Sequence, residues 1–263
     1  MAIAIELHTQ LTQHLRELHL PAFRESYQDE ADLARRESLT YEQYLLELAG
    51  KECEARADKR TVRYLRESKL PLEKNIDIFD RKRLPLKVNA LVDHLLDGSF
   101  LERNENVLAF GNPGSGKTHL LCAIGQELIR QGRRVLFTPC NHLVQELLIA
   151  KRELNLTRLL KKLSRYDALV IDDIGYVQQS REEMEVLFTL LADRYERGTV
   201  MLTSNLPFSK WEQIFKDPMT TAAAIDRLVH HSIILELNLP SYRLEQSKNN
   251  QKESGGEKHA TTN

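Results

Sequence analysis

The chain has 263 residues, of which 41% are hydrophobic and 29% carry a charge, a balance typical of a globular protein. Its 37 Lys and Arg residues nearly balance its 38 Asp and Glu residues, so a nucleic-acid-binding surface would have to be local. No stretch approaches the roughly 20 apolar residues of a membrane helix, and the N-terminus lacks the layout of a signal peptide. The 3 cysteines are widely spaced without a C-x-x-C pair, which favours reduced thiols in a cytoplasmic protein and argues against a zinc site.

Residues 1–70 predict helices and no strand. Leucines recur at helical spacing in the first helix, and Pro21 can occupy the first turn of the second. Thr40 opens a third helix with Gln43 as its capping-box partner, and this helix is expected to turn Leu45 inward. We therefore predict a small all-α N-terminal domain, which is either a docking platform for a partner or a simple accessory bundle.

A run of basic residues lies near the end of this helical segment. Side chains at steps of three or four residues can share one helix face, and here they outnumber the acids Asp58 and Glu67. The run is either a solvated face or a contact for nucleic-acid phosphates. The run comprises Arg56, Lys59, Arg60, Arg63, Arg66 and Lys69, of which the first four are our candidates for DNA binding.

Beyond residue 106, short apolar runs alternate with helical patterns. Buried strands that alternate with helices are typical of a parallel sheet covered on both faces. The predicted strands are 107–110, 134–138, 168–172, 200–203 and 233–237, and the predicted helices are 117–131, 140–151, 156–164, 181–197 and 220–230. We assign residues 71–245 to this domain and expect the polar residues 246–263 to form a disordered tail.

The sequence GNPGSGKT at residues 111–118 fits G-x-x-x-x-G-K-[ST], the phosphate-binding loop of nucleoside triphosphatases. A strand pattern precedes it and a helix start follows it, which is the context that the motif requires. The glycines let backbone N–H groups point at a phosphate chain, Lys117 should reach the β- and γ-phosphates, and Thr118 should bind Mg²⁺. The candidate ATP-binding residues are Gly111, Asn112, Pro113, Gly114, Ser115, Gly116, Lys117, Thr118 and His119.

Two carboxylates, Asp172 and Asp173, end the apolar strand that begins at residue 168. An acid at the end of a buried strand can hold Mg²⁺, a role that we assign to Asp172 together with Thr118. Asp173 is the candidate that polarises the attacking water. Asn205, in the sequence TSN that ends the next strand, is the candidate that orients this water.

Two arginines lie late in the chain. Arg227 is on the helix before the last strand, where it can complete the ATP site of a neighbouring subunit as an arginine finger or form a surface salt bridge. Arg243 follows the last strand and is either a second sensor of the phosphates or a structural residue.

A second basic segment precedes the strand with the paired acids, and Glu153 is its only acid. In a ring or spiral of subunits, such a segment would line the inner surface and follow a phosphate backbone. A solvated helix face is the alternative. The basic residues are Lys151, Arg152, Arg158, Lys161, Lys162 and Arg165.

The sequences GNPGSGKTHL, ALVIDDIG, TSN, AIDRL and SYR together resemble the IstB-like transposition helper ATPases, which belong with the DnaC-type helicase loaders in the AAA+ class. The resemblance covers nearly the whole chain except the tail. It implies an α/β fold, in which a P-loop AAA+ core with a five-stranded parallel sheet follows the helical domain. By matched position it supports Lys117, Thr118, Asp172, Asp173, Asn205 and Arg227. Many relatives carry Glu where this chain has Asp173. This difference bears only on the rate of ATP turnover.

The resemblance further implies an ATPase that uses ATP and Mg²⁺, forms a homo-oligomer on duplex DNA with little sequence preference, and assists a transposase through its N-terminal domain. A replicative helicase loader is the alternative function. Two other classes stay open, a small-molecule P-loop kinase and a nucleotide-gated DNA scaffold that hardly hydrolyses ATP. The paired acids, TSN and AIDRL argue against the kinase.

Overall fold

The computed structural model describes residues 2–174, 180–211 and 218–242. The chain divides into two compact units, Met1–Arg63 and Tyr64–Asn263, and each is described by itself. Every helix in the described ranges is too short or too polar to cross a membrane.

The first unit is built from α1 (Ala2–Glu17), α2 (Pro21–Glu37) and most of α3 (Tyr41–Ser68). The predicted capping box at the start of α3 is confirmed. The backbone N–H of Gln43 donates to Thr40 Oγ1 at 3.2 Å, and the N–H of Thr40 donates to Gln43 Oε1 at 2.8 Å. These two bonds satisfy N–H groups that a helix start leaves without partners.

The core of the first unit is small, with Leu15 and Leu48 buried. Leu45, which the pattern turned inward, is 57% exposed, because a unit of three helices covers only part of the surface of α3. A buried carboxylate, Glu52 of α3, accepts the N–H of Ala22 at 2.9 Å. Since α2 has no cap from its own side chains, Glu52 replaces it from a neighbouring helix.

The second unit contains a parallel sheet and the helices that cover it. Its helices are α4 (Leu86–Leu96), α5 (Lys117–Arg130), α6 (Cys140–Arg152), α7 (Leu156–Leu163), α8 (Arg181–Arg194) and α10 (Pro218–Val229), with short 3-10 turns at Arg81–Arg83, Ser99–Leu101 and Phe208–Lys210. Its strands are β1 (Asn106–Gly111), β2 (Val135–Pro139), β3 (Ala168–Ile174), β4 (Thr199–Ser204) and β5 (Ser232–Leu237).

The five strands pair in the order β2-β3-β4-β1-β5, and every pairing is parallel. The predicted five-stranded parallel sheet is therefore confirmed. Because all strands point the same way, the ends of β1, β3 and β4 lie at one edge of the sheet, which brings together the three segments with the predicted site residues.

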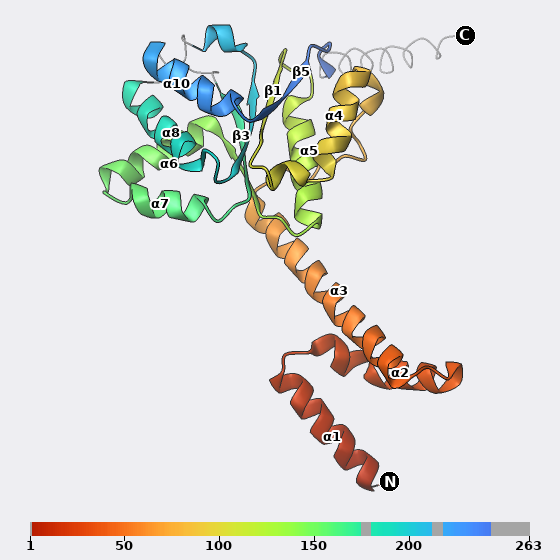
Figure 1. Ribbon diagram of the computed structural model, residues 1–263. Helices are drawn as coiled ribbons and strands as arrows, with labels where there is room; N and C mark the ends of the chain where they lie inside the picture. Colours follow the sequence, from red (N-terminus) through yellow and green to blue (C-terminus); the bar gives the residue numbers. More distant parts are fainter. Residues whose placement is uncertain (1, 175–179, 212–217, 243–263) are drawn as a thin grey trace, which may run out of the picture. The chain divides into compact units, whose positions relative to one another are not determined.

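Helices cover both faces of the sheet (Figure 1). α6, α7, α8 and α10 pack on one face, and α4 and α5 pack on the other. Within β1, Leu108 and Phe110 contact the first layer while Val107 and Ala109 contact the second. This alternation explains the unbroken apolar run of the strand, since both of its faces are buried.

Candidate nucleotide site

The loop between β1 and α5 has the shape of an anion cradle. Gly114 has φ 80° and Gly116 has φ 95°, conformations that L side chains rarely adopt. A Cβ at Gly114 would lie 2.2 Å from Ser241 Oγ, and one at Gly116 would lie 3.2 Å from the ring of Phe79. The loop therefore needs glycine, and it leads into the N-terminus of α5, where backbone N–H groups attract a phosphate.

Lys117, the first residue of α5, is only 6% exposed. Its ammonium donates to the carbonyl of Gly111 at 2.8 Å and to that of Asn112 at 2.9 Å. The side chain is therefore folded back over its own loop. A positive charge buried beside a cradle of N–H groups is complementary to a polyphosphate.

Thr118 and Asp172 are in direct contact, as expected for residues that share a metal ion. The hydroxyl of Thr118 donates to Asp172 Oδ1 at 2.7 Å. Mg²⁺ usually binds through one or two protein oxygens, and phosphate oxygens and water complete its shell. No cluster of three or more His, Cys, Asp or Glu that could hold a metal occurs among the described residues, so a cation here would need those phosphate oxygens.

Thr203 of β4 connects the two acids. Its hydroxyl donates to Asp172 Oδ1 at 2.7 Å and accepts the backbone N–H of Asp173 at 2.7 Å. Asp173 has φ 64°, and the pairing of β3 with β4 shifts register between Ile171 and Ile174. This irregularity turns the Asp173 carboxylate away from the direction that a regular strand would give it.

The side chain of Asn205 donates to Asp173 Oδ1 at 3.0 Å. Burial and the neighbouring charge of Asp172 raise the pKa of the Asp173 carboxyl, and the ammonium of Lys117 opposes them. A carboxylate with a raised pKa is a better proton acceptor than an ordinary Asp. Asp173 and Asn205 thus form a pair that can bind and polarise a water molecule beside the phosphate loop.

A cavity of about 460 Å³ adjoins the phosphate loop, and sequence reasoning missed most of its walls. The ring of Phe79 meets that of His119 edge-on, with centroids 5.2 Å apart, and His119 Nε2 lies 2.9 Å from the Asn75 carbonyl oxygen. His119, a predicted ATP-binding residue, therefore lines this cavity. Residues 74–80 show no periodic pattern, so only an aromatic residue in a proline-containing linker could have drawn attention to them.

Residues after β5 also line the cavity. The N–H of Tyr242 donates to the Gly114 carbonyl at 3.0 Å, and the Arg83 guanidinium lies 5.3 Å from the centroid of the Tyr242 ring. Arg83 also donates to the Pro240 carbonyl at 3.0 Å. A cavity with aromatic and apolar walls beside a phosphate cradle fits a nucleobase. Arg243, the other predicted contact in this segment, lies outside the described residues.

Arg227 of α10 lies far from the phosphate loop of its own chain. Its guanidinium lies 4.8 Å from the centroid of the Phe188 ring on α8, and it lines a small cavity with Asn106 and Val200. Both residues lie at the start of their strands, whereas the phosphate loop follows the end of β1. The length of β1, roughly 17–20 Å, separates the two places. Arg227 therefore cannot touch a nucleotide in the same subunit.

The predicted DNA-binding residues occupy two surfaces. In the first unit, Arg56 donates to Glu52 at 2.8 Å and to the His19 carbonyl at 2.8 Å, so its guanidinium ties the turn between α1 and α2 to α3. Lys59, Arg60 and Arg63 are exposed on α3.

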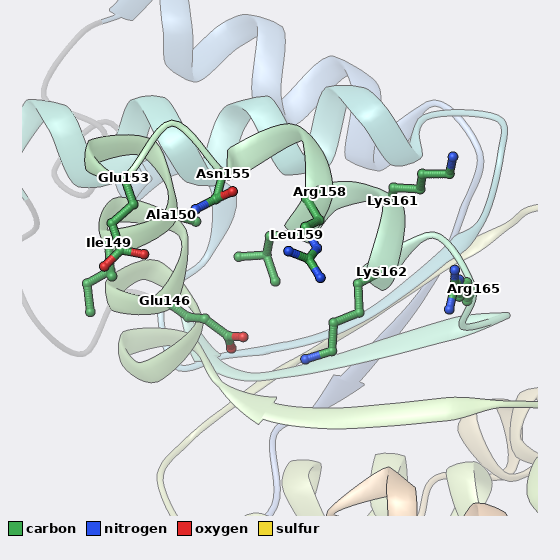
Figure 2. A pocket seen from close by; sticks show the side chains of 10 residues that line it. All are labelled: Glu146, Ile149, Ala150, Glu153, Asn155, Arg158, Leu159, Lys161, Lys162 and Arg165. Carbon is green, nitrogen blue, oxygen red and sulfur yellow. The ribbon is translucent and has the colours of Figure 1, made fainter.

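In the second unit, α6 and α7 enclose a cavity of about 610 Å³ (Figure 2). The carboxylate of Glu146 on α6 faces Arg158 and Lys162 on α7 across this space, a neighbour that the sequence did not reveal. Two of the predicted DNA-binding residues form ion pairs with α8: Lys151 lies 2.9 Å from Glu185, and Arg152 lies 3.7 Å from Glu182. The remaining four, which make no ion pair with any described residue, are Arg158, Lys161, Lys162 and Arg165.

Comparisons with known proteins agree with this geometry. Residues 13–250 match the family described as IstB-like ATP binding protein. An insertion sequence ATP-binding protein of Sinorhizobium fredii is 43% identical over 230 residues, which cover 87% of this chain and 77% of the relative. The IS21 insertion sequence ATP-binding protein of Pseudomonas aeruginosa is 38% identical over 215 residues, covering 82% and 81% of the two chains.

Solved structures with a similar fold include replication proteins. The crystal structure of the DnaC helicase loader matches with a TM-score of 0.54 and 19% identity, over 62% of this chain and 96% of that one. A structure of the replication initiator DnaA, bound to AMPPCP and single-stranded DNA, matches with a TM-score of 0.54 and 19% identity, over 70% of this chain and 56% of that one. The chain therefore belongs to the family of IstB-like ATP-binding proteins, and its second unit has the P-loop AAA+ fold that DnaC and DnaA share.

Proposed function

We propose that this protein is a Mg²⁺-dependent ATPase that assembles on duplex DNA and assists an insertion-sequence transposase. The observation that best supports ATP hydrolysis is the chain of hydrogen bonds from Thr118 through Asp172 and Thr203 to Asp173 and Asn205, beside a glycine cradle. A pair of residues for Mg²⁺ and a pair for water then lie next to the place where a γ-phosphate would bind. The names of the relatives, which describe ATP-binding proteins of insertion sequences, support the same assignment.

The position of Arg227 supports ATP sites shared between subunits. Because this arginine lies at the opposite edge of the sheet from its own phosphate loop, it can contribute to catalysis only in the site of a neighbour. Arg227→Ala should then keep ATP binding by the isolated subunit but lose ATPase activity and ATP-dependent assembly on DNA. Lys117→Ala should have the reverse defect, with ATP binding weakened at least about tenfold.

A mixing experiment tests both assignments together. An interface between the two variants can pair the intact phosphate loop of the Arg227→Ala subunit with the intact arginine of the Lys117→Ala subunit. ATPase activity should therefore return above the sum of the separate variants. Lys87→Ala, on an exposed residue of α4, is the control for loss of a lysine. Full activity of Arg227→Ala alone would show that sites are not shared, and full activity of Lys117→Ala would refute the nucleotide site.

DNA binding is proposed for the basic surface of α7. Lys161→Glu and Lys162→Glu should weaken binding to unrelated duplexes to the same extent, because phosphate contacts carry no sequence information. Each lost phosphate contact should flatten the log–log dependence of affinity on salt by about one unit. Lys87→Glu is the matched control. If affinity and salt slope survive both reversals, Lys59, Arg60 and Arg63 on α3 become the next candidates.

The partner of the N-terminal unit separates the two functions that fit this fold. The insertion-sequence relatives favour a transposase, whereas a helicase loader would use the same ATPase core with another partner. A transposase reading frame beside the gene supports the first, and a helicase gene there supports the second. Turnover measured with and without DNA distinguishes an ATPase from a nucleotide-gated scaffold.

A further inference from the structure

Leu154, in the turn between α6 and α7, has an exposed apolar side chain on a left-handed backbone. Its side chain is 93% exposed, and its backbone has φ 57°. The turn is a Schellman motif, in which the N–H of Asn155 donates to the Ala150 carbonyl at 2.7 Å and the N–H of Leu154 donates to the Lys151 carbonyl at 3.2 Å. Glycine is the usual residue at this left-handed position, and Asn is the usual substitute.

Leucine at this position does not favour the stability of the fold. Its Cβ is strained in the left-handed region, and its exposed side chain contributes no burial to offset that strain. Glycine or asparagine would form the same turn with less strain. A strained conformation together with an exposed apolar side chain points to a role outside the folded subunit.

The surroundings of Leu154 favour a polyanionic partner. The following helix, α7, presents Arg158, Lys161 and Lys162, which make no ion pair within the described residues. Figure 2 shows Glu153 and Asn155, the residues on either side of Leu154, at the turn that joins α6 to this basic helix. The immediate neighbours of Leu154 are an acid and an amide, and the basic side chains without an ion pair among the described residues begin one helical turn later, at Arg158. An apolar tip on the turn that leads into a basic helix is complementary to duplex DNA, which has phosphates on the outside and apolar base stacks within.

We propose that Leu154 is an apolar wedge that enters between base pairs of bound duplex DNA and kinks it, an inference that rests on the proposed DNA binding. Partial insertion of leucine between two base steps separates their stacked faces and bends the duplex. The phosphate contacts of α7 hold the backbone, and the wedge adds a local deformation without reading base edges. Binding then favours flexible pyrimidine–purine steps, because these are the least costly to unstack.

The test compares variants of the full chain on duplexes with 2-aminopurine at successive positions, since the fluorescence of this base rises when it is unstacked. Leu154→Asn removes the wedge and suits the left-handed backbone, so it should not destabilise the fold. Leu154→Met keeps a large apolar side chain at this position. Leu86→Asn is the matched control, because Leu86 is 89% exposed on a different helix, α4.

The wild-type protein, Leu154→Met and Leu86→Asn should raise the fluorescence on binding, most strongly at pyrimidine–purine steps. Leu154→Asn should lose most of this rise while its Kd, measured by anisotropy, increases no more than about tenfold, because phosphate contacts supply most of the affinity. If Leu154→Asn keeps the rise, the wedge is refuted. If it keeps DNA affinity but loses assembly between subunits in sedimentation, Leu154 contacts a second copy of the chain and the wedge is equally refuted.

The same measurements separate this inference from the function on which it rests. Absence of DNA binding by the wild-type protein would refute the proposed function itself. Binding by the wild-type protein without any rise in fluorescence would refute the wedge alone and leave DNA binding intact.

Discussion

Replacing Thr203 with valine tests whether the two acids are organised by one hydroxyl. Thr203 is 1% exposed, and valine has nearly the same shape, so the change removes hydrogen bonds without opening a cavity. The hydroxyl group makes two bonds of 2.7 Å, one to the Asp172 carboxylate and one from the Asp173 N–H. Both partners would lose this contact in Thr203→Val.

The size of the effect follows from these two bonds. A hydrogen bond to an ionised carboxylate contributes about 1.5–3 kcal/mol, and a backbone N–H left without a partner costs about 1–3 kcal/mol. The buried methyl group of valine offsets roughly 1 kcal/mol of this loss. We therefore expect the free energy of unfolding to fall by about 2–4 kcal/mol, which lowers Tm by roughly 5–15 °C for a domain of this size.

ATP turnover should fall further than stability alone would explain. Since Thr203 fixes the Asp172 carboxylate and the left-handed backbone of Asp173, its loss misplaces both acids. We expect kcat to fall at least about tenfold, equivalent to about 1.4 kcal/mol in the barrier. Turnover is measured well below the lowered Tm, so that the variant remains folded.

Thr203→Ser is the matched control, because it keeps the hydroxyl and loses only a methyl group. It should lose roughly 1 kcal/mol of stability and keep turnover within about threefold. Wild-type melting and wild-type turnover in Thr203→Val would show that the hydroxyl does not organise the site, and equal losses in both variants would point to packing instead.

Three further substitutions test other parts of the structure. Burial and the charge of Asp172 raise the pKa of Asp173 in the folded state above its ordinary value of 3.8, so the free energy of unfolding falls as pH rises from 3.8 through the folded-state pKa. Asp173→Asn should therefore be more stable than wild type at pH 7 in denaturant titrations, and this difference in stability should vanish below pH 3.8. Phe79→Ala removes an aromatic wall of the cavity beside the phosphate loop. Measured by calorimetry, its affinity for ATP should fall about tenfold while its affinity for inorganic triphosphate stays unchanged. An equal loss of affinity for both ligands would argue against a nucleobase in that cavity. Arg194 is 3% exposed and donates to the backbone carbonyls of Leu163, Tyr166, Asp167 and Thr199. Arg194→Met should therefore lower the free energy of unfolding by about 3–5 kcal/mol, whereas Arg197→Met, at an exposed position, should leave it almost unchanged.

The sequence alone determined the features that depend on local pattern. The glycine spacing of residues 111–118, between a strand pattern and a helix start, predicts an anion cradle before any contact is known. Apolar runs that alternate with helices predict a parallel sheet, and a parallel sheet brings the ends of its strands to one edge. This is why Thr118 and Asp172, which the sequence assigns to the same Mg²⁺, come into contact although they lie 54 residues apart.

Only the tertiary structure decided the features that depend on contacts between distant segments. Arg83 donates a hydrogen bond to the carbonyl of Pro240, 157 positions away in the chain, and neither segment has a periodic pattern that would predict this contact. Glu146 lies close in the chain to the basic helix α7, and both helices were predicted, but the sequence did not show that the Glu146 carboxylate faces Arg158 and Lys162.

The conformation of single residues also came from packing rather than from pattern. A leucine and an aspartate give no signal in the sequence that they will adopt φ 57° and φ 64°, yet these angles aim Leu154 outward and Asp173 toward Asn205. Periodicity reports which side of an element is buried, because burial repeats along the element. It does not report which distant segment supplies the cover, since that choice is made by the summed packing of the whole domain.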